Sequence, residues 1–249
     1  MNKIFSLIFI LVGIGCTQGT EQSLIIATAA NMQFAIRDLS EEYTKKNKVP
    51  CDLVISSSGK LTAQIIEGAP FDVFVSADTS YPSRLFREGF TLDSMNIYGY
   101  GKIVIWTLKE TIDPVLDSLN ISKIDHLSVP NPKTAPYGIA EMEYLQYENV
   151  YSRIENKLVF GESVAQTNHF VTSGAVDMGI TAKSVVLSSE LQNSGKWSEP
   201  PSNTYQPIAQ GMVILKSTSS PERAKDFRNF IFSTEGQAIL KKYGYNTIN

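Results

Sequence analysis

Three consecutive serines, Ser56, Ser57 and Ser58, stand where the chain could bind an anion. They follow an extended apolar run at 52–55 and precede an apolar-periodic segment at 61–66, so they mark the turn from a strand into a helix. The first turn of a helix exposes unpaired backbone N–H groups at the positive end of its dipole. Because serine hydroxyls add donors without adding charge, this turn suits the reversible binding of an oxyanion.

A second junction of the same plan lies near the amino terminus. There an apolar strand at 23–28 is followed by small residues and by Asn31, a polar helix cap. Serine and asparagine are also ordinary capping residues, and each junction taken alone is explained by capping. Two such junctions close together in an α/β sheet predict a pocket.

Five segments of the chain, in this order, resemble the periplasmic molybdate-binding proteins of ABC transporters. They are Ala-Ala-Asn at 29–31, Ser-Ser-Gly-Lys-Leu at 57–61, Gly-Ala-Pro-Phe-Asp-Val-Phe-Val-Ser-Ala-Asp at 68–78, Asn-Pro-Lys-Thr-Ala-Pro-Tyr-Gly at 131–138 and Lys-Tyr-Gly-Tyr at 242–245. The resemblance implies the type II periplasmic binding protein fold. This is a two-lobed α/β fold with mostly parallel sheets, helices on both faces and a ligand cleft between the lobes.

The resemblance also implies the residues that would bind the oxyanion. Asn31 stands where many members have serine, and it would donate through its backbone and its amide. Ser58 aligns with the binding serine of the family, and Ser57 is the alternative one residue away. Tyr137 and Val164 match positions that donate through the main chain.

The chain departs from the family at Ala182, where classical members have a tyrosine whose hydroxyl donates to the ligand. The amide of Asn31 or the phenol of Tyr137 would have to replace that donor, and the change bears on selectivity among molybdate, tungstate and sulfate. Lys60 is expected on the surface of the emerging helix. Asp78 is expected outside the site, because a carboxylate would repel the anion.

The order of apolar segments predicts alternating strands and helices, and hence a mostly parallel sheet in each lobe. Lobe 1 is expected to comprise residues 23–99 and 206–249, and lobe 2 residues 100–205. The chain would then cross twice between the lobes, with the ligand held between them. We expect a monomer that delivers its ligand to the permease of an ABC transporter.

Residues 1–15 have the charged start and short apolar core of a signal peptide. Cys16 follows a small residue and resembles the lipidated cysteine of a bacterial lipobox, with residues 16–22 as the lipidated residue and its tether. Gly13 replaces the usual leucine, which leaves ordinary signal cleavage as the alternative outcome. The protein is therefore expected outside the cytoplasm, on the periplasmic or cell-surface side of a bacterial membrane, held there by a lipid anchor. Only Cys51 would remain after processing, so no intramolecular disulfide can form.

Composition excludes several other classes of function. The 249 residues carry a net charge of −3 with 19% charged residues and no basic stripe, which argues against nucleic acid as a partner. His126 and His169 share no spacing with cysteine that would bind a metal cation. No serine or cysteine pairs with a histidine in a recognisable motif, so we expect neither an enzyme nor a cofactor.

Three alternatives stay open at this point. One is a binding protein for another oxyanion, such as sulfate or phosphate. A hydrolase or phosphotransferase built on the same anion pocket is the second. The third is a sensory or adhesive lipoprotein that has kept the fold.

Overall fold

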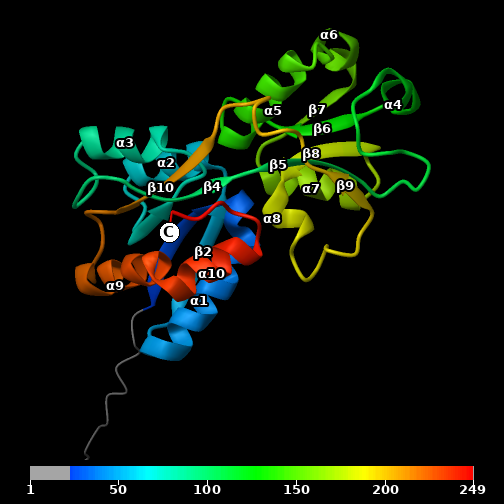
Figure 1. The fold of residues 1–249 in the computed structure, drawn as a ribbon. Helices are drawn as coiled ribbons and strands as arrows, with labels where there is room; N and C mark the ends of the chain where they lie inside the picture. Colours follow the sequence, from blue (N-terminus) through cyan, green and yellow to red (C-terminus); the bar gives the residue numbers. More distant parts are fainter. Residues whose placement is uncertain (1–22, 249) are drawn as a thin grey trace, which may run out of the picture.

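The computed structural model describes residues 23–248, which form two lobes joined by two chain crossings (Figure 1). The predicted signal peptide, Cys16 and the tether lie outside the described residues. Each lobe is built on a five-stranded sheet with helices packed against it, as the sequence predicted. Within residues 23–248, no helix is long and apolar enough to cross a membrane.

The first sheet has the strand order β2-β1-β3-β10-β4. Its strands are β1 (Leu24–Ala29), β2 (Cys51–Ser56), β3 (Val73–Val75), β4 (Asn96–Gly101) and β10 (Ile208–Ile214). The second sheet has the order β7-β6-β8-β5-β9. Its strands are β5 (Ile103–Thr107), β6 (Leu127–Pro130), β7 (Leu158–Gly161), β8 (Met178–Ala182) and β9 (Lys196–Ser198).

Each sheet is mixed, but four of its five strands run in the same direction, so the sheets are mostly parallel as predicted. β1 runs parallel to β2 and β3, and β6 runs parallel to β7 and β8, as expected for strands joined through helices. β10 runs antiparallel to β3 and β4, and β5 runs antiparallel to β8 and β9. β10 and β5 are therefore the strands that run against the rest of their sheets, and each begins where the chain has crossed from the other lobe.

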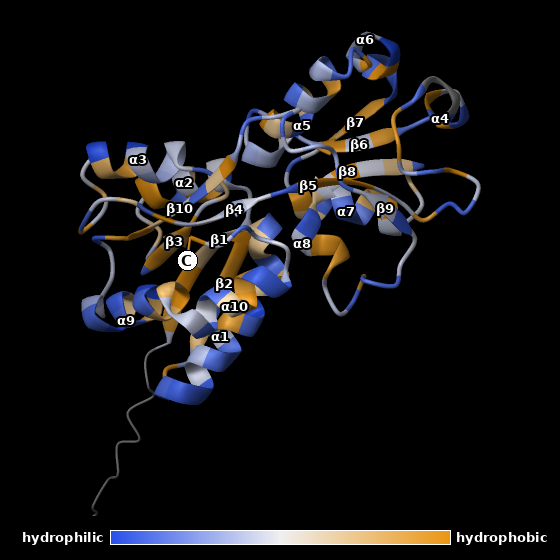
Figure 2. Cartoon of the chain, in the orientation of Figure 1, coloured by the Kyte–Doolittle hydropathy of each residue, from blue (hydrophilic) through white to orange (hydrophobic). Residues whose placement is uncertain are grey.

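Alternation along the strands of the first sheet decides which helices cover which face. Ile26 and Val75 face a large core that includes residues of α1 (Gln33–Asn47), α9 (Pro221–Phe232) and α10 (Thr234–Lys242). Ala27 and Phe74 face a smaller core with residues of α2 (Ser58–Ile66) and α3 (Ser80–Arg87). Figure 2 shows the hydrophobic colouring concentrated on the strands between these helices. The sheet is therefore covered on both faces.

The second lobe carries the remaining helices. They are α4 (Ser118–Lys123), α5 (Pro136–Tyr147), α6 (Tyr151–Ile154), the 3-10 turn η2 (Glu155–Lys157), α7 (Val164–Thr172) and α8 (Lys183–Val186). In the first lobe, a 3-10 turn η1 (Ala30–Met32) leads from β1 into α1. Four of the β-to-helix turns, before η1, α2, α5 and α7, lie where the lobes meet.

The crossings lie close to the predicted lobe boundaries. β4 stays in the first sheet to Gly101, two residues beyond the predicted boundary at 99/100, and β5 begins at Ile103 in the second sheet. At the crossing, Glu199 accepts a hydrogen bond from Lys102 Nζ (2.6 Å) and pairs with Lys183. Burial alone would raise the pKa of Glu199, but the hydrogen bonds from the two lysines hold it below its usual value. Two ammonium groups thus share one carboxylate beside the hinge.

Candidate anion-binding site

A small cavity lies between the two lobes and contains all five predicted site residues. The first lobe contributes Ala29, Ala30, Asn31, Ser57, Ser58 and Ala77, and the second lobe contributes Ala135, Pro136, Tyr137 and Val164. The cavity is small and leaves about 10 Å³ for the centre of a water-sized sphere. Every side chain that lines it is uncharged.

Four helical segments begin at this cavity. η1 begins at Ala30, α2 at Ser58, α5 at Pro136 and α7 at Val164. A helix N-terminus carries partial positive charge and N–H groups without intrahelical acceptors. The cavity is therefore electropositive without containing a formal charge.

The first turn of α2 shows which donors remain available. Ser57 caps the helix, since its Oγ accepts from the backbone N of Lys60 (3.4 Å). The N–H of Gly59 donates across the cleft to the carbonyl of Thr134 (3.0 Å). In the described part of the chain, the N–H of Ser58 has no partner, and its Oγ accepts from the N–H of Ala77 (3.0 Å). Ser58 thus keeps both its N–H and its hydroxyl proton available for a ligand.

The second lobe presents main-chain donors at two helix starts. In α5, Pro136 has no N–H and Gly138 N–H donates to the carbonyl of Ala135 (2.9 Å), so Tyr137 supplies the first unused N–H. In α7, Ser163 caps the N–H of Gln166 (3.3 Å), while that of Val164 has no acceptor among the described hydrogen bonds. Both donors sit at the predicted positions.

Asn31 is held by a buried network on the first lobe. Its Nδ2 donates to Gln210 Oε1 (2.9 Å) and to Tyr245 Oη (3.1 Å). Its carbonyl accepts from Ser184 Oγ of the second lobe (2.6 Å). Its Oδ1 is buried, and it has no hydrogen-bond partner among the described residues. Asn31 thus lines the cavity and has one side-chain amide atom without a partner among the described residues.

Sequence reasoning missed the residues that hold Asn31. Gln210, Tyr245 and Ser184 lie between 153 and 214 residues away from it, so no local spacing could have found them. Only the Lys-Tyr-Gly-Tyr segment at 242–245 gave a signal, as part of the family resemblance, and it gave no role for Tyr245.

Ala182 is buried at the end of β8 and does not line the cavity. The phenol of Tyr137 accepts a hydrogen bond from Gln210 Nε2 (3.0 Å). Burial raises the pKa of Tyr137 well above its usual value and that of Tyr245 to about 12, so both phenols stay protonated and neutral.

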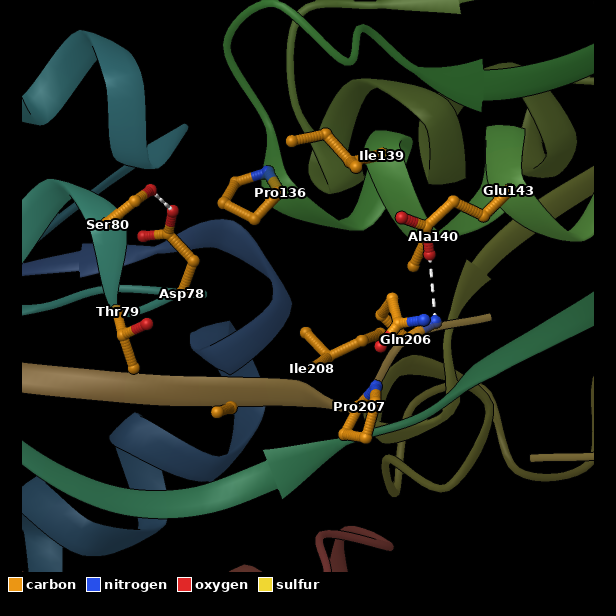
Figure 3. A pocket seen from close by; sticks show the side chains of 11 residues that line it. Asp78, Thr79, Ser80, Pro136, Ile139, Ala140, Glu143, Gln206, Pro207 and Ile208 are labelled. Carbon is orange, nitrogen blue, oxygen red and sulfur yellow. Dashed lines mark hydrogen bonds between the residues drawn. The ribbon is translucent and has the colours of Figure 1, made fainter. Parts of the chain in front are cut away.

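Two charged residues near the site contact groups outside the cavity. Lys60 lies about half exposed on α2 and pairs with Glu162 of the second lobe. Asp78 lines the neighbouring cleft, which leaves about 220 Å³ for the centre of a water-sized sphere and meets the cavity at Pro136. Figure 3 shows Asp78 turned toward Ser80 in this cleft, and Glu143 bonded to Gln206 on its far side (2.8 Å). Residues 23–248 contain no group of three or more His, Cys, Asp or Glu side chains that could hold a metal ion.

Known proteins are similar to this chain in sequence and in fold. Residues 24–246 match the family of bacterial extracellular solute-binding proteins. The molybdate-binding protein ModA of Rhodobacter capsulatus is 33% identical over 225 residues, which cover 90% of this chain and 88% of the relative. ModA of Azotobacter vinelandii is 32% identical over 222 residues, covering 88% of each chain.

A solved structure agrees with these sequence matches. The periplasmic molybdate-binding protein of Azotobacter vinelandii superimposes with a TM-score of 0.84 at 30% identity, covering 91% of this chain and 100% of that one. The predicted two-lobed periplasmic binding protein fold is therefore confirmed. The chain belongs to the bacterial extracellular solute-binding proteins, and its relatives place it in the ModA group of that family.

Proposed function

We propose that the protein binds a single tetrahedral oxyanion, molybdate or tungstate, in the cavity between its lobes and delivers it to an ABC transporter permease. One observation carries the proposal: four helix N-termini from both lobes meet at a small cavity without charged side chains. Such a site binds a dianion through oriented N–H and O–H donors. The names of the relatives, molybdate-binding proteins, support the choice of ligand.

The size and shape of the cavity favour a small inorganic anion. It leaves only about 10 Å³ for the centre of a water-sized sphere, so an organic phosphate would not fit while the lobes are closed. Because the donors come from both lobes, the anion would hold the lobes together. Without a lysine or arginine in the lining, release requires only that the lobes part.

Sulfate, phosphate and molybdate differ in size and protonation. A cage of fixed main-chain donors discriminates by donor distance, since an anion that is too small leaves hydrogen bonds long and weak. Phosphate carries a proton at neutral pH and needs an acceptor. We infer that molybdate and tungstate bind well and sulfate binds little.

We propose that the protein is a binding protein and has no enzymatic activity or cofactor. Its relatives are named as binding proteins, and no carboxylate, histidine, lysine or cysteine lines the cavity. A hydrolase would need a nucleophile with a base or a metal at that place.

We also propose that the mature protein is a monomer anchored to the membrane through a lipid on Cys16. The short apolar core before Cys16 and the polar tether after it support this anchor. One cysteine that carries two or three acyl chains anchors stably, whereas a single chain does not. The tether would let the lobes reach the permease.

Calorimetric titration of the purified protein with molybdate, tungstate, sulfate and phosphate tests the ligand. We expect clear binding of molybdate and tungstate and little or none of sulfate. Equal affinity for sulfate and molybdate would contradict the assignment, and a preference for phosphate would place the protein with a different class of transporter.

A further inference from the structure

Gln210 lies at the centre of the buried network behind the cavity. It belongs to β10, is fully buried, and stands where the register between β10 and β4 shifts. Its Oε1 accepts from Asn31 Nδ2 (2.9 Å), and its Nε2 donates to Tyr137 Oη (3.0 Å). One amide therefore connects a site residue of the first lobe with a site residue of the second.

The backbone at the first crossing is shaped to fit this amide. A Cβ added at Gly101, the last residue of β4, would overlap both Tyr137 Oη and Gln210 Nε2. Only glycine lets the crossing strand pass so close to the pair. The contact between Gln210 and Tyr137 is thus fixed by packing as well as by its hydrogen bond.

The hydrogen bonds leave Asn31 with the wrong atom free for an anion. Both protons of its Nδ2 are used, by Gln210 Oε1 and by Tyr245 Oη, and the buried atom without a protein partner is Oδ1. An oxygen acceptor offers nothing to an oxyanion and would repel it. A half turn of the side-chain amide exchanges its oxygen and nitrogen, and would place a donor there.

Asn31 cannot turn alone. If only its amide rotated, its Oδ1 would face Gln210 Oε1, and two acceptors would be in contact. If Gln210 rotates as well, its Nε2 faces Asn31 Oδ1 and its Oε1 accepts from the Tyr137 hydroxyl. The two amides are therefore coupled.

The surrounding hydroxyls allow this paired rotation. Tyr98 Oη lies 2.6 Å from Gln210 Oε1 and 2.8 Å from the carbonyl of Ser76, so it can donate to Ser76 and accept from the rotated Gln210. Tyr245 Oη, which donates to the Asn31 carbonyl (3.1 Å), can donate to the rotated side chain of Asn31 instead, and the carbonyl keeps Ser184 as its donor. After rotation the amide contacts are again donor–acceptor pairs, one hydrogen bond to the Asn31 carbonyl is given up, and Asn31 Nδ2 replaces the unpaired oxygen.

We propose that Gln210 is a positioning residue for the oxyanion site. Anion binding turns the amides of Gln210 and Asn31 together, so that Asn31 Nδ2 donates to the anion and Gln210 holds Asn31 by its oxygen. The proposal rests on the proposed function, because it requires an anion in the cavity. In this way the Asn31 amide would supply a side-chain donor that the chain otherwise lacks, because Ala182 replaces the tyrosine of the family.

Side-chain amide NMR tests the rotation in the wild-type protein. Without anion, the Gln210 amide protons should show nuclear Overhauser contacts to the Tyr137 ring. With saturating molybdate those contacts should move to the Tyr98 ring. The main-chain amide signals of Ser58 and Val164 report whether molybdate binds. If they shift but the contacts of the Gln210 amide stay unchanged, to either ring, the proposal is overturned. If those main-chain amides do not shift either, the proposed function itself fails.

A double-mutant cycle tests whether Gln210 acts through Asn31. Gln210→Leu and Asn31→Leu should each weaken molybdate binding by about tenfold, the effect of one donor to a charged group. The double variant should lose no more than either single one, because both changes remove the same donor. Losses that multiply to about a hundredfold would show independent roles and overturn the proposal.

Gln237 provides the matched control. It is buried like Gln210, and its Nε2 donates to the carbonyls of Tyr98 (3.1 Å) and Ile231 (3.0 Å), away from the cavity lining. Gln237→Leu should lower the thermal stability and leave the Kd for molybdate unchanged. If it weakens binding as much as Gln210→Leu does, the effect of Gln210 is only structural.

Discussion

At the scale of single residues, Ser58 offers the clearest test. Its N–H and its hydroxyl proton have no acceptor among the described residues, while Ser57 and Gly59 have hydrogen-bond partners. Removing a donor to a buried charged group costs about 1.5–3 kcal/mol, or roughly ten- to a hundredfold in Kd. Ser58→Ala should therefore weaken molybdate binding by that factor without unfolding the protein. Calorimetric titration measures the change.

The neighbouring serines are the controls for Ser58. Ser56 is only partly buried and does not line the cavity, so Ser56→Ala should change the Kd little. Ser57 caps α2, and Ser57→Ala should lower stability by about 1 kcal/mol. If Ser57→Ala carries the loss of affinity and Ser58→Ala does not, the binding serine is Ser57.

The buried carboxyl group of Glu141 should make the free energy of unfolding depend on pH. It is fully buried in α5, neither carboxylate oxygen has a partner among the described residues, and burial raises its pKa well above the usual value. The group is neutral when folded and ionises in the unfolded chain above about pH 4.5. The contribution of Glu141 to the free energy of unfolding is therefore fully present below that pH. It is lost as the pH rises through the pKa that the group has in the folded protein.

Glu141→Gln removes this dependence. As the pH rises from about 4.5, the free energy of unfolding of the wild type should fall relative to that of the variant. The difference should grow by up to about 1.4 kcal/mol per pH unit. Urea unfolding at pH 4.5 and pH 7 measures the difference. Glu148→Gln, at the exposed end of the same helix, should leave the slope unchanged. Parallel curves for wild type and Glu141→Gln would show that Glu141 is ionised in the folded protein.

At the scale of elements, the start of α2 couples the site to closure of the lobes. Gly59 N–H donates to Thr134 of the second lobe, and a Cβ at Gly59 would lie 2.8 Å from Tyr81 Oη and 3.0 Å from the Thr134 carbonyl. Alanine there would hold the lobes apart. It would also improve the helix, since alanine is favoured over glycine by up to about 1 kcal/mol.

Gly59→Ala should therefore change affinity and stability in opposite directions. The Kd for molybdate should rise about 5- to 30-fold through faster dissociation, while the ligand-free protein becomes slightly more stable. Stopped-flow dissociation and thermal unfolding measure the two effects. Lys60→Gln is the control, because the exposed pair with Glu162 contributes little. Unchanged dissociation in Gly59→Ala would show that the contact with Thr134 does not hold the lobes closed.

The alternation of strands and helices could be predicted from the sequence because the ends of many elements carry local signals. The helices α9 and α10 begin at Pro221 and directly after the cap Ser233, which are start signals that the sequence itself carries. The strand β4 carries weaker local signals, because Gly99 and Gly101 disfavour a strand. Those glycines are explained by close approach to other segments, which only the folded chain shows.

The candidate site divides in the same way. The residues at helix starts could be predicted, since a helix start has a local pattern and the family resemblance fixed the register. Gln210, which connects Asn31 with Tyr137, could not be predicted, because its partners are distant in sequence. The pairing of Lys60 with Glu162 also requires the closed lobes, and only the exposure of Lys60 could be predicted from the sequence.

At the scale of the whole molecule, the protein would work outside the cytoplasm on a tether. If Cys16 carries the lipid, Cys16→Ser should release the protein into the soluble fraction or leave it as uncleaved precursor. Membrane fractionation and mass spectrometry of the amino terminus measure this. Molybdate binding by the released protein should match that of the wild type. A fully soluble wild-type protein whose amino terminus is not residue 16 would show ordinary signal cleavage.

The central claim is that both lobes together hold one oxyanion at four helix starts. An anomalous difference map from crystals grown with molybdate, recorded at the molybdenum absorption edge, tests it most directly. The account predicts a single strong peak in the cavity between Ser58, Tyr137 and Val164, within hydrogen-bond distance of their main-chain nitrogens. A peak elsewhere on the protein, or an empty cavity at saturating molybdate, would contradict it.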